Sequence, residues 1–115
     1  MDKQVWQAAL PRLALAACLF PCVVLAADPE VSIVIKDHLF VPAEVKVPAG
    51  KKVKLLVENQ DATAEEFESH GLNREKVIPA RSKAVIFIGP LAPGKYPFFG
   101  DFHQDTARGV VIAEE

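Results

Sequence analysis

The side chains of this chain that could bind a metal ion are imidazoles and carboxylates. The three histidines are His38, His70 and His103, and carboxylates gather in two short segments, 65–68 and 101–105. Nitrogen and oxygen ligands of these kinds suit Cu(II), iron, zinc or manganese, and ligand type alone does not rank these metals. The sequence therefore contains candidate metal ligands but does not identify the metal.

Thiolate chemistry is missing from the part of the chain that we expect to fold. Both cysteines, Cys18 and Cys22, precede residue 28. We expect the segment that contains them to be removed, which leaves a domain with no thiolate and no disulfide partner. Small domains in oxidising compartments often rely on disulfides, so this domain must be stabilised by its core, or partly by a bound ligand.

Residues 1–27 have the three-part organisation of a secretory signal peptide. Lys3 and Arg12 come first, and an apolar run over 13–26 follows, interrupted by Pro21. The run is about 14 residues long, short of the roughly 20 that a membrane-spanning helix needs. We therefore expect export to the periplasm and cleavage before Ala27 or Asp28, where small residues suit the peptidase.

A lipidated N-terminus at Cys18 is the alternative. Residues 15–18, Leu-Ala-Ala-Cys, fit a lipobox. However, five apolar residues separate Arg12 from Cys18, against the ~7–15 expected of the apolar region of a signal. We therefore favour cleavage near residue 27.

Length and composition limit the remainder to one domain, residues 28–115. The chain has 115 residues and is 50% hydrophobic, which is enough for a single compact core. The segment 28–115 carries 11 basic and 14 acidic residues, a net charge of −3. Nucleic acid is therefore not an expected partner.

Short β-branched and alternating segments predict an all-β sandwich. No stretch after residue 27 has helical periodicity longer than about two turns. Proline and glycine mark turns at 48–50 and 90–94. The expected strands cover residues 31–35, 44–47, 52–57, 83–88, 95–99 and 109–113.

Residues 63–66 are ambiguous. Thr63 and Glu66 fit a capping box, and Gly71 could end a helix of about two turns that begins there. Local propensity alone therefore predicts a helix at this point.

Framework motifs over nearly the whole of 28–115 resemble those of the cupredoxin family. The resemblance implies a Greek-key β-sandwich, and it implies a strand at 65–67, because the segment after the family's asparagine carries the first metal ligand. We therefore expect a strand there in place of the helix. The motifs are Phe40-Val41-Pro42, Val47-Pro48-Ala49-Gly50, Val57-Glu58-Asn59, Phe67 and Pro93-Gly94-Lys95-Tyr96-Pro97-Phe98.

A blue-copper site combines two imidazoles and a thiolate with a weak axial ligand, usually methionine. The family pattern would place the first imidazole at about Glu65, the thiolate at Gly100, the second imidazole at His103 and the methionine near Arg108. His103 alone matches. The resemblance therefore implies a cupredoxin-like fold that lacks the blue-copper site.

Further motifs are similar to those of periplasmic cupredoxins of bacterial iron-uptake systems, among them the cupredoxin of Ftr-type transporters and the N-terminal domain of EfeO-type proteins. The motifs are Glu-Glu-Phe-Glu-Ser at 65–69, Asn-Arg-Glu-Lys at 73–76, Gly-Pro-Leu at 89–91 and Phe-Phe-Gly-Asp-Phe-His at 98–103. This similarity implies that the protein binds copper or iron and works with a periplasmic iron-binding protein and an inner-membrane iron permease. The candidate metal ligands that follow from it are His38, Glu65, Glu66, Asp101 and His103.

The choice between Glu65 and Glu66 stays open. Plastocyanin-type spacing favours Glu65, whereas the EfeO-type alignment favours Glu66. The two must face opposite sides of a strand. Glu68 shares the face of Glu66, and that face could simply be a solvated edge paired with Arg74 or Lys76.

Each candidate ligand also has a plainer interpretation. His103 could hydrogen-bond a backbone carbonyl, and His38 could lie at a strand end. Asp101 and Asp105 occupy a tight loop, where aspartate often satisfies its own backbone. His70, beside Gly71, is expected to be a turn residue.

A metal-binding protein that assists iron uptake is the function we expect. The alternatives are a copper-dependent ferroxidase, a copper storage or delivery protein, and a metal-free interaction module. Whether the protein turns over as an enzyme is left open by the sequence.

Overall fold

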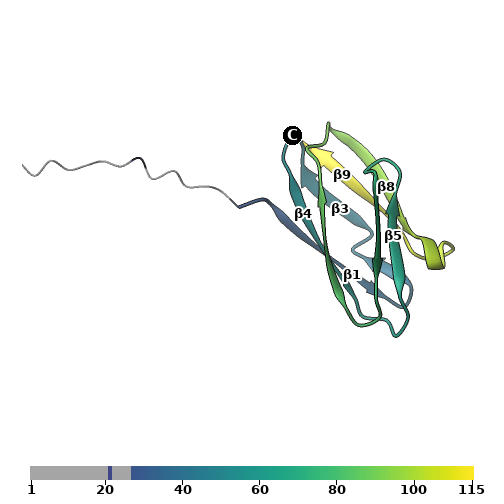
Figure 1. The fold of residues 1–115 in the computed structure, drawn as a ribbon. Helices are drawn as coiled ribbons and strands as arrows, with labels where there is room; N and C mark the ends of the chain where they lie inside the picture. Colours follow the sequence, from purple (N-terminus) through teal and green to yellow (C-terminus); the bar gives the residue numbers. More distant parts are fainter. Residues whose placement is uncertain (1–20, 22–26) are drawn as a thin grey trace, which may run out of the picture.

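The computed structural model describes residue 21 and residues 27–115, and these residues form two facing layers of strands (Figure 1). The predicted signal peptide lies almost entirely outside the described residues. Within them no helix is long and apolar enough to cross a membrane. The elements are β1 (Glu30–Lys36), β2 (Leu39–Val41), β3 (Glu44–Pro48), β4 (Val53–Asn59), β5 (Glu65–Ser69), β6 (Arg74–Ile78), β7 (Lys83–Ile88), β8 (Gly94–Gly100), the 3-10 helix η1 (Asp101–His103) and β9 (Arg108–Glu114).

The strands form one four-stranded and one five-stranded sheet. Their orders are β2-β1-β4-β7 and β3-β9-β8-β5-β6. Two pairings are parallel, β1 with β4 and β3 with β9, and the others are antiparallel. The predicted all-β sandwich is therefore confirmed.

Alternation of apolar and polar residues builds the core between the sheets. In β4, Val53, Leu55 and Val57 are fully buried and alternate with partly exposed residues, as expected when successive side chains point to opposite faces of a sheet. In β9, Val111 and Ala113 do the same from the facing sheet.

Three phenylalanine rings fill the core in mutual contact. Phe67 and Phe98 stack at 4.9 Å, and Phe40 meets Phe98 edge-on at 4.9 Å. Each ring lies two residues along the chain from a candidate ligand or from the position expected for a thiolate. Phe40 follows His38, Phe67 follows Glu65, and Phe98 precedes Gly100. The aromatic cluster therefore anchors the three segments that carry the candidate ligands.

The segment at 65–69 is strand β5, not a helix. It hydrogen-bonds on one side to β6 and on the other to β8. The capping-box interpretation of 63–66 is wrong because pairing with two neighbouring strands and burial of Phe67 outweigh a weak local preference for helix.

Candidate metal centre

Three separate segments bring imidazole and carboxylate groups together. His38 lies in the turn between β1 and β2, Glu65 begins β5, and His103 ends η1. One potential ligand atom from each of the three lies within 4.8 Å of the others. The structure thus gathers His38, Glu65 and His103 from the five predicted ligands.

Glu65 is the most buried member of this group. Its side chain is 2% exposed. One carboxylate oxygen accepts the backbone N–H groups of Glu66 and Phe102, both at 3.0 Å, and the other lies 2.6 Å from His103 Nδ1. A carboxylate can only accept, so His103 donates from Nδ1. Both oxygens of Glu65 are therefore held in fixed directions.

Gly100 leaves the space that the Glu65 carboxylate occupies. A Cβ atom at Gly100 would lie 2.5 Å from Glu65 Cδ and 2.7 Å from both Glu65 Oε1 and Ala107 Cβ. Real Cβ atoms do not approach other atoms so closely. At the position where the family resemblance expected a thiolate, the carboxylate of Glu65 therefore takes the room of a side chain.

His38 is fixed by Asp61, a residue of the loop between β4 and β5. Asp61 Oδ1 accepts the backbone N–H of Asp37 at 2.8 Å, and Oδ2 accepts that of His38 at 3.0 Å. Asp37 and His38 both have positive φ angles, 53° and 58°, a conformation that is uncommon outside glycine. The two hydrogen bonds therefore stabilise a turn that the backbone alone would not favour.

The imidazole of His38 also faces Asp61. Its Nδ1 is buried, has no hydrogen-bond partner, and lies 3.4 Å from Asp61 Oδ2. The contact is close enough for charge attraction, but its geometry is not that of a hydrogen bond. A buried nitrogen without a directional partner is costly unless a ligand or a movement of the ring satisfies it.

Asp61 is ionised more readily than an ordinary aspartate. Burial of its carboxyl opposes ionisation, but the backbone hydrogen bonds from His38 and Asp37, together with the nearby imidazoles of His38 and His103, outweigh that effect. They hold the pKa of Asp61 below its usual value of 3.8. Asp61 is thus a charged carboxylate beside the imidazole pair at neutral pH.

The two imidazoles stack on each other. Their centroids are 3.6 Å apart and their planes are 13° from parallel. A ring nitrogen binds a metal in the plane of its ring, so two parallel rings direct their lone pairs along nearly parallel lines. A metal shared by His38 and His103 therefore requires one ring to tilt away from the stack.

Hydrogen bonds join the loops that carry these groups. Thr106 Oγ1 donates to His38 O at 2.7 Å and ties the loop after η1 to the β1–β2 turn. Buried Asn59 donates to Thr63 O at 2.9 Å and to Ile78 O at 3.1 Å, and its Oδ1 accepts the N–H of Asp61 at 3.0 Å. Asn59, part of a framework motif in the sequence, therefore positions the loop that holds Asp61.

Glu66 and Asp101, the other two predicted ligands, lie in a second group with Glu68. Their carboxylates come within 4.8 Å of one another. A hydrogen bond shared with Glu75, followed by burial and the charges of Glu75, Asp101 and Glu68, raises the pKa of Glu66 to about 7. Alternation along β5 separates Glu65 from Glu66, as the sequence predicted.

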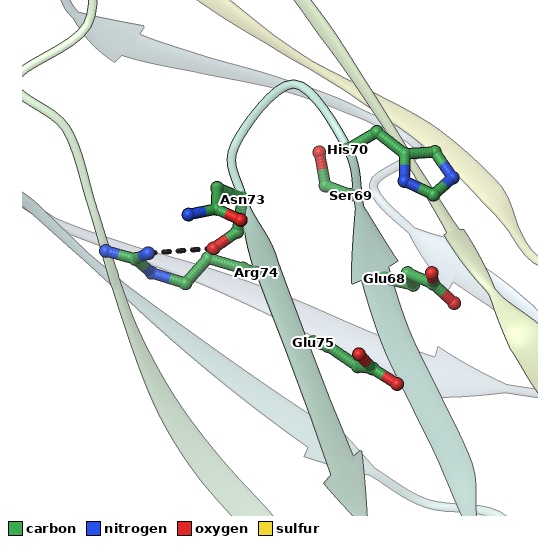
Figure 2. Close-up of a pocket in the computed structure, with 6 residues that line it drawn as sticks. All are labelled: Glu68, Ser69, His70, Asn73, Arg74 and Glu75. Carbon is green, nitrogen blue, oxygen red and sulfur yellow. Dashed lines mark hydrogen bonds between the residues drawn. The ribbon is translucent and has the colours of Figure 1, made fainter.

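His70 is exposed in the turn after β5, as expected, and packs against Phe99 at 5.8 Å. It lines a pocket of about 200 Å³ with Glu68 and Glu75 (Figure 2). It is not a member of the group formed by His38, Glu65 and His103.

Asp61 is the contributor that the sequence analysis missed. A single aspartate in a turn after Asn59 carries no pattern of its own, because aspartate is common in turns for local reasons. The hint lay in its neighbour: Asn59 belongs to a framework motif, and it fixes the backbone of Asp61 through a 3.0 Å hydrogen bond.

Comparison with known proteins agrees with this fold. The cupredoxin-like domain matches residues 9–113. The chain belongs to the cupredoxin-like domain family. It is also 54% identical over 86 residues to the uncharacterized protein RP394 of Rickettsia prowazekii (strain Madrid E), covering 75% of this chain and 69% of that protein.

Solved cupredoxins share the architecture at low sequence identity. Auracyanin A, a blue copper protein from Chloroflexus aurantiacus, superposes with a TM-score of 0.67 at 14% identity, over 76% of this chain and 100% of auracyanin. The metal-binding domain of the Cu(I)-exporting P-type ATPase CopA of Streptococcus pneumoniae D39 gives 0.67 at 15% identity, over 75% and 85%. At these identities the likeness shows the fold alone.

The residues of this cupredoxin-like domain fit copper without a thiolate. Residues 28–115 contain no cysteine, and the space next to Gly100 is filled by Glu65. A type 1 site therefore does not fit. Two imidazoles and a carboxylate are ordinary ligands of Cu(II), and His38, Glu65 and His103 each place one potential ligand atom within 4.8 Å of the others.

Proposed function

We propose that this cupredoxin-like protein binds copper through His38, Glu65 and His103. The observation that carries the proposal is the carboxylate of Glu65, which is buried, points at His103 and fills the room beside Gly100. A carboxylate fixed by two backbone N–H groups and an imidazole is preorganised for an ion. Bound copper would supply a redox-active Cu(II)/Cu(I) couple with nitrogen and oxygen ligands.

Two modes of ligation become possible once one imidazole tilts away from the stack. In one mode His103 and Glu65, which are in contact at 2.6 Å, would both be ligands of the metal. In the other mode His38 and His103 would be the ligands, and Glu65 and Asp61, which face their Nδ1 atoms, would orient the rings, as carboxylates often do for metal-binding histidines. Glu65→Gln distinguishes the modes, because loss of a ligand changes the Cu(II) electron paramagnetic resonance spectrum more than loss of an orienting partner.

Within this function we propose a role in periplasmic iron uptake. The support is the resemblance of the 65–69 and 98–103 motifs to cupredoxins of iron-uptake systems. The partners would be a periplasmic iron-binding protein and an inner-membrane iron permease. Deletion of the gene should slow growth under iron limitation, and a gene encoding His103→Ala should fail to restore it.

Calorimetric titration with Cu(II) tests the metal centre directly. His103→Ala should weaken binding by more than the roughly 10–100-fold that loss of a supporting partner costs, without unfolding the domain. Affinity of the parent should also fall from pH 7 to pH 5, because an imidazole must lose its proton to bind a metal.

His70→Ala is the matched control, since His70 is an exposed histidine outside the group. It should bind Cu(II) like the parent. Loss of copper in His70→Ala with full binding in His103→Ala would refute the assignment of the site.

A further inference from the structure

A pocket of about 480 Å³ lies beside the stacked imidazoles of the copper centre. His38 and His103 both line it, whereas the buried Glu65 does not. Pockets that hold small molecules in proteins usually measure about 300–1,000 Å³, so this one has room for more than a water molecule. The other lining residues come from η1 and the loop after it, and they are Asp101, Phe102, Gln104, Asp105 and Thr106.

The protein supplies three ligand atoms to the copper centre. Within the described part of the chain, no fourth histidine or carboxylate joins the group of His38, Glu65 and His103. Asp61 lies close by, but its two oxygens accept backbone N–H groups. Cu(II) with nitrogen and oxygen ligands favours a square-planar or tetragonal arrangement, which needs at least four ligands. A fourth ligand must therefore come from outside the chain.

The pocket is the side from which this ligand can approach. The Glu65 side chain is 2% exposed and closes the centre toward the core. The side chains of His38 and His103 are 42% and 27% exposed and border the pocket. One of these stacked rings must tilt before both can bind one metal ion, and the pocket gives that ring the space to do so.

The charges around the pocket disfavour an anion. Asp101 and Asp105 line it, and no lysine or arginine is among its lining residues. At the centre itself, the carboxylates of Glu65 and Asp61 already offset the two positive charges of Cu(II). An anion that entered the pocket would meet two further carboxylates without compensation, whereas a neutral ligand would not be repelled.

Phe102 gives the pocket an apolar wall. Its side chain is exposed, while its backbone N–H donates to the Glu65 carboxylate at 3.0 Å. The backbone of Phe102 is thus fixed at the centre, and its ring is left free to contact a ligand. Aromatic rings pack favourably against one another in stacked or edge-on arrangements, so this wall favours a ligand that is itself a ring.

We propose that the copper centre keeps one open position facing this pocket, and that this position binds a small neutral nitrogen donor of the imidazole type. The open position presupposes the copper site proposed above. Nitrogen ligands of this kind suit Cu(II), carry no charge into the pocket and present a ring to Phe102. The donor replaces a water molecule, and the oxidation state of copper does not change.

Titration of the Cu(II)-loaded protein with imidazole, followed by the Cu(II) electron paramagnetic resonance spectrum, tests the open position. The sample is protein that calorimetry has shown to hold one Cu(II), so failure of the copper site itself would be seen beforehand as absence of Cu(II) binding. The spectrum should change to that of a complex with one imidazole, and copper should stay with the protein on gel filtration. An unchanged spectrum, or removal of copper by imidazole, overturns the open position.

Azide, a small anion, tests the role of charge. The double variant Asp101→Asn/Asp105→Asn should bind azide at least about 3-fold more tightly than the parent, because two repelling carboxylates are gone, and it should bind imidazole like the parent. Asparagine keeps the oxygen that accepts from Gln104 Nε2 at position 101, so the loop retains this contact.

Glu114→Gln/Glu115→Gln is the matched control for the loss of two charges. Both glutamates are exposed, and they lie at the end of β9 away from η1. This variant should bind azide like the parent. Equal azide affinities of Asp101→Asn/Asp105→Asn and the parent would overturn the choice of a neutral donor.

Phe102→Ala tests whether the donor lies in this pocket. Loss of the ring should weaken imidazole binding to the Cu(II)-loaded protein by roughly 2- to 10-fold, the range expected for one aromatic contact. Azide has no ring, so its affinity should stay that of the parent. Imidazole binding of parental strength in Phe102→Ala would overturn the placement of the donor beside Phe102.

Discussion

The buried carboxylate of Glu65 can be accommodated only because residue 100 is a glycine. The buried carboxylate lies where the β-carbon of any other residue at 100 would be, and it is held there by Phe102 N–H and His103. A larger residue at 100 would need a shorter one at 65. The oxygen ligand and the missing thiolate are therefore coupled by packing.

Gly100→Ala should lower the free energy of unfolding by about 3 kcal/mol or more, at the upper end of the usual cost of overpacking. The added methyl group would overlap Glu65 and Ala107. Urea unfolding, followed by far-ultraviolet circular dichroism, measures the change. Gly71→Ala is the control, because its nearest contact, the ring of Tyr96 at 3.3 Å, can give way at small cost. Equal stability of Gly100→Ala and the parent would contradict the proposed packing.

The colour of the copper-loaded protein follows from the ligands of the centre. The intense band of blue-copper proteins requires a thiolate, and residues 28–115 have no cysteine. Cu(II)-loaded protein should therefore be pale, with weak ligand-field absorption and no strong band near roughly 600 nm. A deep blue solution would show that the ligand assignment is wrong.

At the scale of elements, the β4–β5 loop controls the β1–β2 turn. The Asp61 carboxylate accepts hydrogen bonds from the backbone N–H groups of Asp37 and His38, both of which have positive φ. It also faces the ring of His38. The turn and the orientation of the ring therefore depend on one charged group from a distant loop.

Asp61→Asn should destabilise the protein at pH 7 by about 1–3 kcal/mol, the cost of losing a hydrogen bond to a charged group. The pKa of Asp61 is lowered in the folded state, so its contribution to stability is present above its unfolded pKa and disappears as the pH falls through the lower folded pKa. The difference between variant and parent should thus shrink below roughly pH 4. Urea unfolding at pH 7 and pH 3 measures it.

Asp105→Asn serves as the control for this pH dependence, because Asp105 is an exposed loop aspartate. It should match the parent at both pH values. A deficit of Asp61→Asn that stayed constant from pH 7 to pH 3 would contradict the charge-based explanation.

All six strands that residue patterns predicted are present, and five of them carry buried β-branched residues. The sixth, β8, has the sequence GKYPFFG and follows a turn marked by proline and glycine. Segments 31–35 and 109–113 fall within β1 and β9, and segment 52–57 overlaps β4 from Val53 onward. β5 needed the family resemblance, because Glu-Glu-Phe-Glu has little intrinsic strand preference. β2 and β6 were not predicted: the first has three residues, and the second is an exposed edge strand with a charged sequence.

The site was predictable where single residues coincide with family positions and less so where folding decides. Glu65, His103 and His38 were candidates from sequence, and the structure places them together. Glu66 and Asp101 were grouped with them because sequence spacing does not show how η1 lies against β5. The register of Glu68 with Glu75 likewise depends on β6, which the sequence did not reveal.

At the scale of the whole molecule, the sandwich is held without covalent links. Residues 28–115 have no cysteine, so its stability comes from the apolar core between two sheets and from the hydrogen bonds between strands. Among the described residues, a backbone hydrogen bond to β4 forms close to the predicted cleavage point. Lys54 N–H donates to Pro29 O at 2.8 Å, and Glu30 begins the parallel pairing of β1 with β4.

This arrangement sets where a signal peptide can be removed without harm to the fold. Cleavage before Ala27 or Asp28 keeps Pro29 and every residue of β1, whereas cleavage within β1 would open its pairing with β4. We therefore expect the exported protein to begin at Ala27 or Asp28, where small residues precede the bond. Intact mass of the protein released from the periplasm measures the N-terminus, and a chain expressed from Asp28 should unfold at the same urea concentration as the exported form. A mass that includes Cys18 with an attached diacylglycerol would show instead that the chain is a lipoprotein tethered to a membrane.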